Sequence, residues 1–225
     1  MTRRHQPLRQ WEIGAKQEAT TRDKPKAVLC DLDGVLRLWD PLDDLDRRHG
    51  LPPGTLATAA FAPHRLTPAI TGRTTDEDWR AAVAVDLVAA GHPKTTIRHL
   101  IEDWTTATGR VDHAVADILH ATHLPVVLVT NATTRLEADL RRLQLPDTAD
   151  HVINSARLGI AKPDPRIYEA AAATANVPPH HCLFVDDTEA NVTTATNLGM
   201  TALHYRHPSQ LRHALGLPDT AAPER

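Results

Sequence analysis

The sequence of 225 residues is poor in several features that mark common classes of protein. It has two cysteines, Cys30 and Cys182, far apart inside apolar runs, so neither a disulfide framework nor a structural zinc site is expected. Aromatic residues make up 4% of the chain and the net charge is −3, which disfavours a nucleic-acid-binding surface. No run approaches the ~18 apolar residues of a membrane span, and no apolar signal core follows the first residues. We therefore expect a cytoplasmic protein without nucleic-acid or membrane partners.

The ten glycines form none of the motifs that bind nucleotides or present a nucleophilic serine. The sequence contains no G-x-G pair, no G-x-x-x-x-G-K and no G-x-S-x-G. Any catalysis must therefore come from carboxylates, lysine and hydroxyl groups.

Charge is distributed unevenly along the chain. Residues 1–26 carry seven Lys or Arg against three Asp or Glu and show no periodicity, which predicts a poorly ordered basic extension, or a docking arm. The remaining residues then carry a net charge of about −7. Residues 218–225 are expected to form a tail.

Three short apolar runs end abruptly in polar residues. Residues 27–30 lead into Asp31, residues 125–129 into Thr130, and residues 182–185 into Asp186, as expected of buried parallel strands that open into a polar crevice. Weaker strand candidates lie at residues 151–153 and 201–205.

Helical patterns separate these runs. They cover residues 111–119, 136–143, 166–175 and 188–199, and two have start signals, a Thr134-x-x-Glu137 capping box and an Asp164-Pro165 N-cap. Strands that alternate with helices predict an α/β fold, a parallel sheet covered by helices on both faces. We assign residues 27–39 and 111–217 to this core.

Residues 40–110 lack a convincing strand and show two amphipathic helical patterns, at residues 79–90, after a Thr75-x-x-Asp78 cap, and at 97–104. Ligands of open α/β sheets bind beyond the carboxyl ends of the strands, where this segment leaves the sheet. The segment is therefore predicted to be a helical lid.

Four carboxylates follow two of the predicted strands, Asp31 and Asp33 after the first and Asp186 and Asp187 after the last. If they converge, their like charges require a cation, and hard oxygen ligands suit Mg²⁺. The alternative is that the first pair makes a turn and Asp187 caps a helix.

Four segments of the sequence resemble, in order and spacing, the motifs of the haloacid dehalogenase-like hydrolase superfamily. They are DLDGVL at 31–36, LVTNA at 128–132, AKPDPRIY at 161–168 and VDDTEANV at 185–192. The resemblance implies a Rossmann-like sheet, a helical cap inserted after the first strand, and phosphoryl transfer through an aspartyl phosphate that depends on Mg²⁺.

The same resemblance implies a role for each polar residue. Asp31 would be the nucleophile and Asp33 the general acid and base. Thr130 and Asn131 would hydrogen-bond the phosphoryl oxygens, and Lys162 would screen the negative charge of the phosphate.

The metal ligands are also implied by the resemblance. Asp31, the backbone carbonyl of Asp33, and Asp187 would bind the ion directly, with Asp186 and Asn191 behind them. The choice between Asp186 and Asp187 as the direct ligand is open.

Two further residues lie between the first motif and the predicted lid. Trp39 could form a wall of the substrate pocket, and Arg37 could meet a distal anionic group or be an exposed hinge residue. Trp79 and Trp104 lie on apolar helix faces and are predicted to pack inside the lid.

The function expected from these patterns is hydrolysis of a small phosphorylated metabolite by a Mg²⁺-dependent phosphatase, a monomer or homodimer. Dehalogenases of the superfamily lack an acid two residues after the nucleophile, so Asp33 indicates phosphate esters. Two alternatives stay open, a phosphomutase of the same superfamily and a catalytically idle binding or regulatory member.

Overall fold

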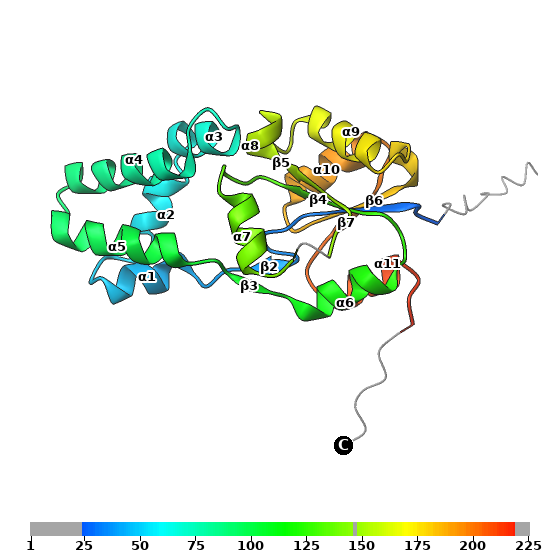
Figure 1. The fold of residues 1–225 in the computed structure, drawn as a ribbon, viewed down its shortest axis with the longest axis horizontal. Helices are drawn as coiled ribbons and strands as arrows, with labels where there is room; N and C mark the ends of the chain where they lie inside the picture. Colours follow the sequence, from blue (N-terminus) through cyan, green and yellow to red (C-terminus); the bar gives the residue numbers. More distant parts are fainter. Residues whose placement is uncertain (1–23, 146–147, 219–225) are drawn as a thin grey trace, which may run out of the picture.

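Five parallel strands form the centre of the fold in the computed structural model, which describes residues 24–145 and 148–218 (Figure 1). The strand order is β5-β4-β1-β6-β7, so β1 lies in the middle of the sheet. All five predicted strands are confirmed. They are β1 (Ala27–Cys30), β4 (Val126–Thr130), β5 (His151–Asn154), β6 (Cys182–Asp186) and β7 (Thr201–His204). The predictions for residues 1–26 and 218–225 fall largely outside the described residues.

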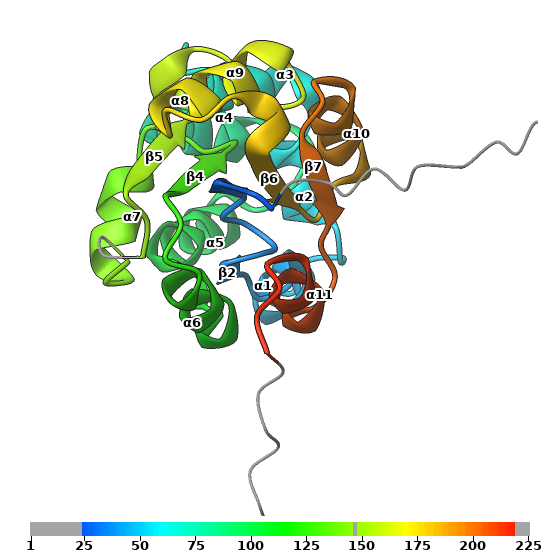
Figure 2. The same ribbon diagram turned by 90° about the vertical axis from the view of Figure 1, so that its right-hand side faces the viewer.

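Helices cover both faces of this sheet (Figures 1 and 2). Alternate residues of β1 point to opposite faces, Val28 into one hydrophobic cluster and Leu29 into the other, as the period of a strand requires. One face packs against α6 (His113–Ala121), α7 (Leu136–Arg142) and α11 (Pro208–Ala214), and the other against α9 (Pro165–Thr174) and α10 (Glu189–Asn197). The short helix α8 (Ser155–Leu158) follows β5. The predicted α/β fold is therefore confirmed.

Five helices lie between β2 (Arg37–Leu38) and β3 (Arg110–Val111), which pair antiparallel. We call residues 42–106 the helical insertion; Figure 1 shows it beyond the carboxyl ends of the strands. Its helices are α1 (Leu42–Arg48), α2 (Thr55–Ala60), α3 (Pro63–Ile70), α4 (Asp76–Ala89) and α5 (Lys94–Thr106). Among the described residues, no helix is both long and apolar enough to cross a membrane.

The helical insertion has a hydrophobic core of its own. Trp79 of α4 and Trp104 of α5 are both buried there, as predicted, and their rings meet edge to face with centroids 4.9 Å apart. The insertion therefore buries its apolar side chains without the help of the sheet.

Two predicted helix starts are confirmed. The Thr75 hydroxyl accepts a hydrogen bond from the Asp78 backbone N–H at 3.1 Å, which caps α4. The Asp164 carboxylate accepts one from the Arg166 N–H at 3.0 Å, with Pro165 in the first turn of α9.

The predicted capping box at Thr134 is wrong. Helix α7 begins one residue later than that box requires, and its N-cap, Arg135, makes no side-chain capping bond. The Thr134 hydroxyl instead accepts a hydrogen bond from the Asp76 backbone N–H at 3.0 Å, and the Thr133 hydroxyl donates to the Asp76 carboxylate at 2.7 Å. A tertiary contact with the helical insertion has therefore replaced the local cap.

Candidate active site

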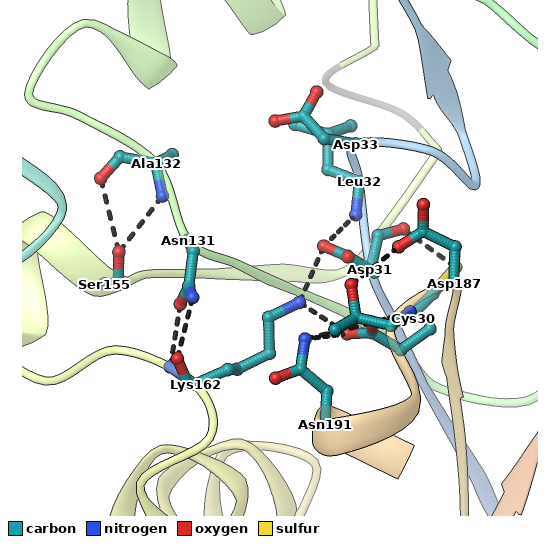
Figure 3. A network of polar contacts seen from close by, with 12 residues as sticks. Cys30, Asp31, Leu32, Asp33, Asn131, Ala132, Ser155, Lys162, Asp187 and Asn191 are labelled. Atoms are coloured by element: carbon teal, nitrogen blue, oxygen red, sulfur yellow. Dashed lines mark hydrogen bonds and ion pairs between the residues drawn. The ribbon is translucent and has the colours of Figure 1, made fainter. Parts of the chain in front are cut away.

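Three carboxylates gather where β1 and β6 end. The two strands are neighbours, and the Asp31 backbone N–H donates to the Val185 carbonyl at 2.8 Å, so the residues that follow both strands emerge together. One oxygen from each of Asp31, Asp186 and Asp187 lies within 4.8 Å of the other two. We call this group the carboxylate cluster (Figure 3).

The turn after β1 passes directly against this cluster. Gly34 has a φ of +85°, and a Cβ atom at this position would lie 2.1 Å from the Asp187 Oδ2 atom. Only glycine tolerates both this backbone conformation and this approach. The glycine of the first motif thus brings the β1 turn and the β6 end into contact.

Lys162 supplies the positive charge inside the cluster. Its Nζ atom lies 2.7 Å from Asp31 Oδ1 and 2.7 Å from Asp186 Oδ2, and the residue is 5% exposed. The Asn131 side chain fixes the Lys162 backbone, because its Oδ1 accepts from the Lys162 N–H at 2.7 Å and its Nδ2 donates to the Lys162 carbonyl at 2.9 Å. The amide of Asn131, predicted to bind phosphoryl oxygens, is therefore engaged in positioning the lysine.

The electrostatics of the cluster follow from its burial. Burial raises the pKa of Asp31 to about 7, and the Asp186 charge adds to this effect while Lys162 opposes it. Burial alone would lower the pKa of Lys162, but Asp31 and Asp186 outweigh it and raise that pKa, so the ammonium stays charged. When all three carboxylates are ionised, they and the ammonium carry a net charge of −2, which one divalent cation would neutralise.

Asp186 and Asp187 have different surroundings. Asp186 is fully buried, and its oxygens accept hydrogen bonds from Asn191 Nδ2 at 3.0 and 3.1 Å and from the Thr188 N–H at 2.8 Å. Asp187 is partly exposed in the pocket, with the Thr188 hydroxyl 3.1 Å from its Oδ1. Carboxylate oxygens of this kind fit Mg²⁺, and the freer one belongs to Asp187.

Thr130, at the end of β4, carries a buried hydroxyl that lacks a hydrogen-bond partner within the described parts of the chain. Buried polar atoms are nearly always paired, and each exception requires an explanation. The residue lines the same pocket as Asp31 and Lys162. A bound ligand oxygen would provide the missing partner.

Asp33 points away from the carboxylate cluster (Figure 3). Its Oδ1 and Oδ2 accept hydrogen bonds from Arg37 Nε at 2.6 Å and Nη2 at 2.8 Å, and Oδ1 also accepts one from Trp39 Nε1 at 2.6 Å. Arg37 is 4% exposed, so the interpretation as an exposed hinge residue is wrong. Its guanidinium also lies 4.6 Å from the Trp39 ring centroid, which places all three side chains in one unit.

A pocket of about 670 Å³ joins these groups to the helical insertion. Its lining includes Asp31, Thr130 and Asp187 at the ends of strands, Lys162 in the loop before α9, and residues of α3, α4 and α5 from the insertion. Trp39 also lines it.

Comparison with known proteins identifies the family. Residues 25–199 match the haloacid dehalogenase-like hydrolases. The chain belongs to this family. The structure of a HAD family enzyme from Bacteroides thetaiotaomicron, solved with magnesium and inorganic phosphate, is similar with a TM-score of 0.64 and 19% identity, over 81% of this chain and 94% of that one.

Curated relatives match shorter parts of this haloacid dehalogenase-like hydrolase. Phosphatase MT3486 of Mycobacterium tuberculosis is 37% identical over 91 residues, which are 40% of this chain and 42% of the relative. The beta-phosphoglucomutase of Bacillus subtilis is 36% identical over 64 residues, 28% of each chain. The chain therefore spans less than half the length of either relative.

Sequence reasoning missed five polar residues that this hydrolase places in the pocket lining, Asp76, Arg80, Thr133, Asp139 and Thr188. Asp76 and Arg80 form an ion pair of 2.7 Å one helical turn apart on α4. The i, i+4 spacing of the two charges was a signal available in the sequence, and the same spacing relates Asp33 to Arg37.

Proposed function

We propose that this hydrolase is a Mg²⁺-dependent phosphatase of small phosphorylated metabolites, with Asp31 as the nucleophile. The observation that carries the proposal is the contact of Asp31 with Lys162 at 2.7 Å inside a carboxylate cluster. The same pocket is lined by Thr130, whose buried hydroxyl has no hydrogen-bond partner among the described residues. Two similarities support the proposal, one to the mycobacterial phosphatase and one to the Bacteroides enzyme in complex with magnesium and inorganic phosphate.

Asp31, Asp187 and the backbone carbonyl of Asp33 would hold the metal, with Asp186 and Asn191 fixing the ligands from behind. When bound, the ion would reduce the repulsion between the Asp31 carboxylate and an anionic phosphate group. Lys162 would contribute in the same way through its contact with Asp31, and the Thr130 hydroxyl would donate to a phosphoryl oxygen.

The reaction then proceeds in two displacements. An oxygen of Asp31 attacks phosphorus, the ester P–O bond breaks, and Asp33 donates a proton to the departing alcohol oxygen. Water next attacks the aspartyl phosphate, Asp33 takes up a proton from it, and the bond between phosphorus and Asp31 breaks to release phosphate. To reach the ester oxygen, Asp33 has to leave Arg37 and Trp39, which now hold it outward.

The helical insertion acts as the cap of this site. It contributes part of the pocket lining, and the contacts of Asp76 with Thr133 and Thr134 fix it to the loop that follows Thr130. Closure over the pocket would exclude bulk water and limit the size of the substrate.

The decisive experiment incubates the full chain with a panel of phosphate monoesters and, separately, with L-2-haloacids. We expect phosphate release that requires Mg²⁺ and stops in chelator, and no halide release. Isomer formation without phosphate release would favour the phosphomutase alternative, which the similarity to beta-phosphoglucomutase supports. Inertness toward the whole panel would favour an idle binding member.

Removing one carboxylate should weaken the metal site. Asp187→Asn is expected to raise the apparent Kd for Mg²⁺ by roughly tenfold to a hundredfold, since a neutral amide replaces a charged ligand. The measurement is the rise of Tm with Mg²⁺ concentration. Glu102→Gln, which removes an exposed carboxylate on α5, is the matched control and should leave the titration unchanged. An unchanged titration in Asp187→Asn would remove Asp187 from the site.

Replacing the carboxyl of Asp33 should allow the two displacements to be measured one at a time. In Asp33→Asn, turnover of an alkyl phosphate is expected to fall roughly 10²- to 10³-fold, since the alcohol leaves without a proton. With 4-nitrophenyl phosphate, whose leaving group needs no proton, the variant should instead give a burst of one nitrophenolate per enzyme, followed by slow turnover. Asp40→Asn, at an exposed carboxylate near the same turn, serves as the control. Equal losses on both substrates without a burst would indicate a structural role.

A further inference from the structure

The wall of the pocket formed by the helical insertion and the β2 segment consists mostly of apolar side chains. Five of its side chains are Trp39, Leu42, Phe61, Leu66 and Ile70. Trp39 is 41% exposed and Phe61 50% exposed, and the other three are partly exposed. These side chains therefore contribute aromatic and aliphatic surface to the pocket, in addition to any contact they make with the core of the insertion.

The two charged groups that the helical insertion contributes to this wall, Asp76 and Arg80, are already paired with each other. Arg37 of β2 also lines the pocket, and its Nε and Nη2 are paired with Asp33, whereas its buried Nη1 has no hydrogen-bond partner among the described residues. Arg80 Nε donates to Asp76 Oδ2 at 2.7 Å, and Arg80 Nη1 donates to the Trp104 carbonyl at 3.2 Å. The guanidinium also stacks on the Trp104 ring at 4.0 Å, and the second Asp76 oxygen accepts from the Thr133 hydroxyl. A second anionic group on a substrate would have to break this arrangement to be bound by Arg80.

The indole N–H of Trp39 is likewise engaged, since it donates to Asp33 at 2.6 Å. A polyhydroxylated leaving group that contacts this wall would lose hydrogen bonds to water, and burying hydroxyl groups without new partners costs free energy. An apolar leaving group would instead gain from the same surface.

We propose that the substrate is a phosphate monoester whose alcohol part is apolar, aromatic or aliphatic, and that Trp39 and Phe61 bind this part. The inference rests on the proposed function, because the same pocket continues from Asp31 and Lys162 to this wall. Trp39 links the two ends of the pocket, since its side chain lines the pocket and its N–H donates to Asp33 until that carboxyl turns toward the ester oxygen.

A series of unbranched alkyl phosphates, from methyl to hexyl phosphate, tests the proposal with Mg²⁺ present. The leaving alcohols have similar acidity, so differences in kcat/KM report on binding of the alkyl chain. We expect kcat/KM to rise up to about fourfold per methylene group, the factor that corresponds to ~0.8 kcal/mol per buried CH₂. The kcat/KM values for glycerol phosphate and hexose phosphates should be lower than the value for butyl phosphate.

Equal kcat/KM values along the alkyl series, or higher values for the polyol esters, would overturn the inference and leave the phosphatase proposal intact. Inertness toward every ester would contradict the phosphatase proposal itself.

Two variants locate the effect on the wall. Phe61→Ala should lower the ratio of kcat/KM for hexyl phosphate over methyl phosphate by roughly fivefold or more. Because Phe61 is half exposed, the change should not prevent folding. Val85→Ala, on the exposed face of α4 and outside the pocket lining, is the matched control and should leave the ratio unchanged. Equal losses on both esters in Phe61→Ala would show that the side chain supports the insertion without contacting the leaving group.

Discussion

Asp31→Asn is expected to abolish phosphate release, with kcat lowered by roughly 10⁴-fold or more. The amide cannot form the aspartyl phosphate, so the two displacements lose their shared intermediate. The fold should survive, because the amide keeps the shape of the side chain and Lys162 retains its contact with Asp186 at 2.7 Å. The measurement is phosphate release at saturating Mg²⁺ and substrate.

The stability of the same variant provides its control. In chelator, Asp31→Asn should unfold at a Tm no lower than that of the wild type, because it removes one charge from a buried site with an excess of negative charge. Acid-quenched samples with a labelled phosphate ester should trap radioactivity in the wild-type protein and not in the variant. Residual activity above about one per cent in a correctly folded variant would exclude Asp31 as the nucleophile.

Lys162→Met should destabilise the protein as well as inactivate it. The methionine leaves Asp31 and Asp186 buried without their counter-charge, and breaking a buried ion pair in this way costs about 3–5 kcal/mol. We expect this loss in the free energy of unfolding at pH 8 in chelator, measured by urea titration. Lys94→Met, at an exposed lysine in the first turn of α5, is the matched control and should change stability little.

The loss of unfolding free energy in Lys162→Met should be smaller at lower pH. Burial already raises the pKa of Asp31 to about 7 in the wild type, and removal of Lys162 should raise it further. An acid with a raised pKa binds more protons in the folded than in the unfolded state, so lowering the pH from 8 to 6 favours the folded variant. Added Mg²⁺ should restore part of the stability at pH 8. A loss that is the same at both values of pH and insensitive to Mg²⁺ would show that Lys162 acts through packing alone.

Much of the site was predictable because it depends on short stretches of sequence and on one rule of sheet geometry. Buried runs such as residues 27–30 identify strands, and the carboxyl ends of neighbouring parallel strands meet at one edge. Asp31, Asp186 and Asp187 therefore converge as their positions in the sequence indicate.

The direction of the Asp33 side chain could not be predicted in this way. It is set by Arg37, which lies in β2 and pairs with Val111 of β3, on the far side of the helical insertion in the sequence. The burial of Arg37 depends on that long-range pairing, and no local pattern reports it. This explains why the residue could be taken for an exposed one.

The prediction of where α7 starts was wrong for a similar reason. The box at Thr134 satisfies the local pattern, but the Asp76 backbone N–H offers its hydroxyl another partner. Local propensity is a weak guide wherever such a distant partner competes. The contact also involves the Asp76 side chain, through Thr133, so it could be found only once the two parts of the chain were placed together.

The separate hydrophobic core of the helical insertion, built around Trp79 and Trp104, has a consequence for local opening. Segments that pack around their own core tend to unfold as cooperative units with a lower free energy than the whole molecule. Amide protons of α4 and α5 should therefore exchange with deuterium through openings that leave β1 and β6 protected. A ligand bound in the pocket, which is lined by residues of both the sheet domain and the helical insertion, should slow this exchange most strongly in the insertion.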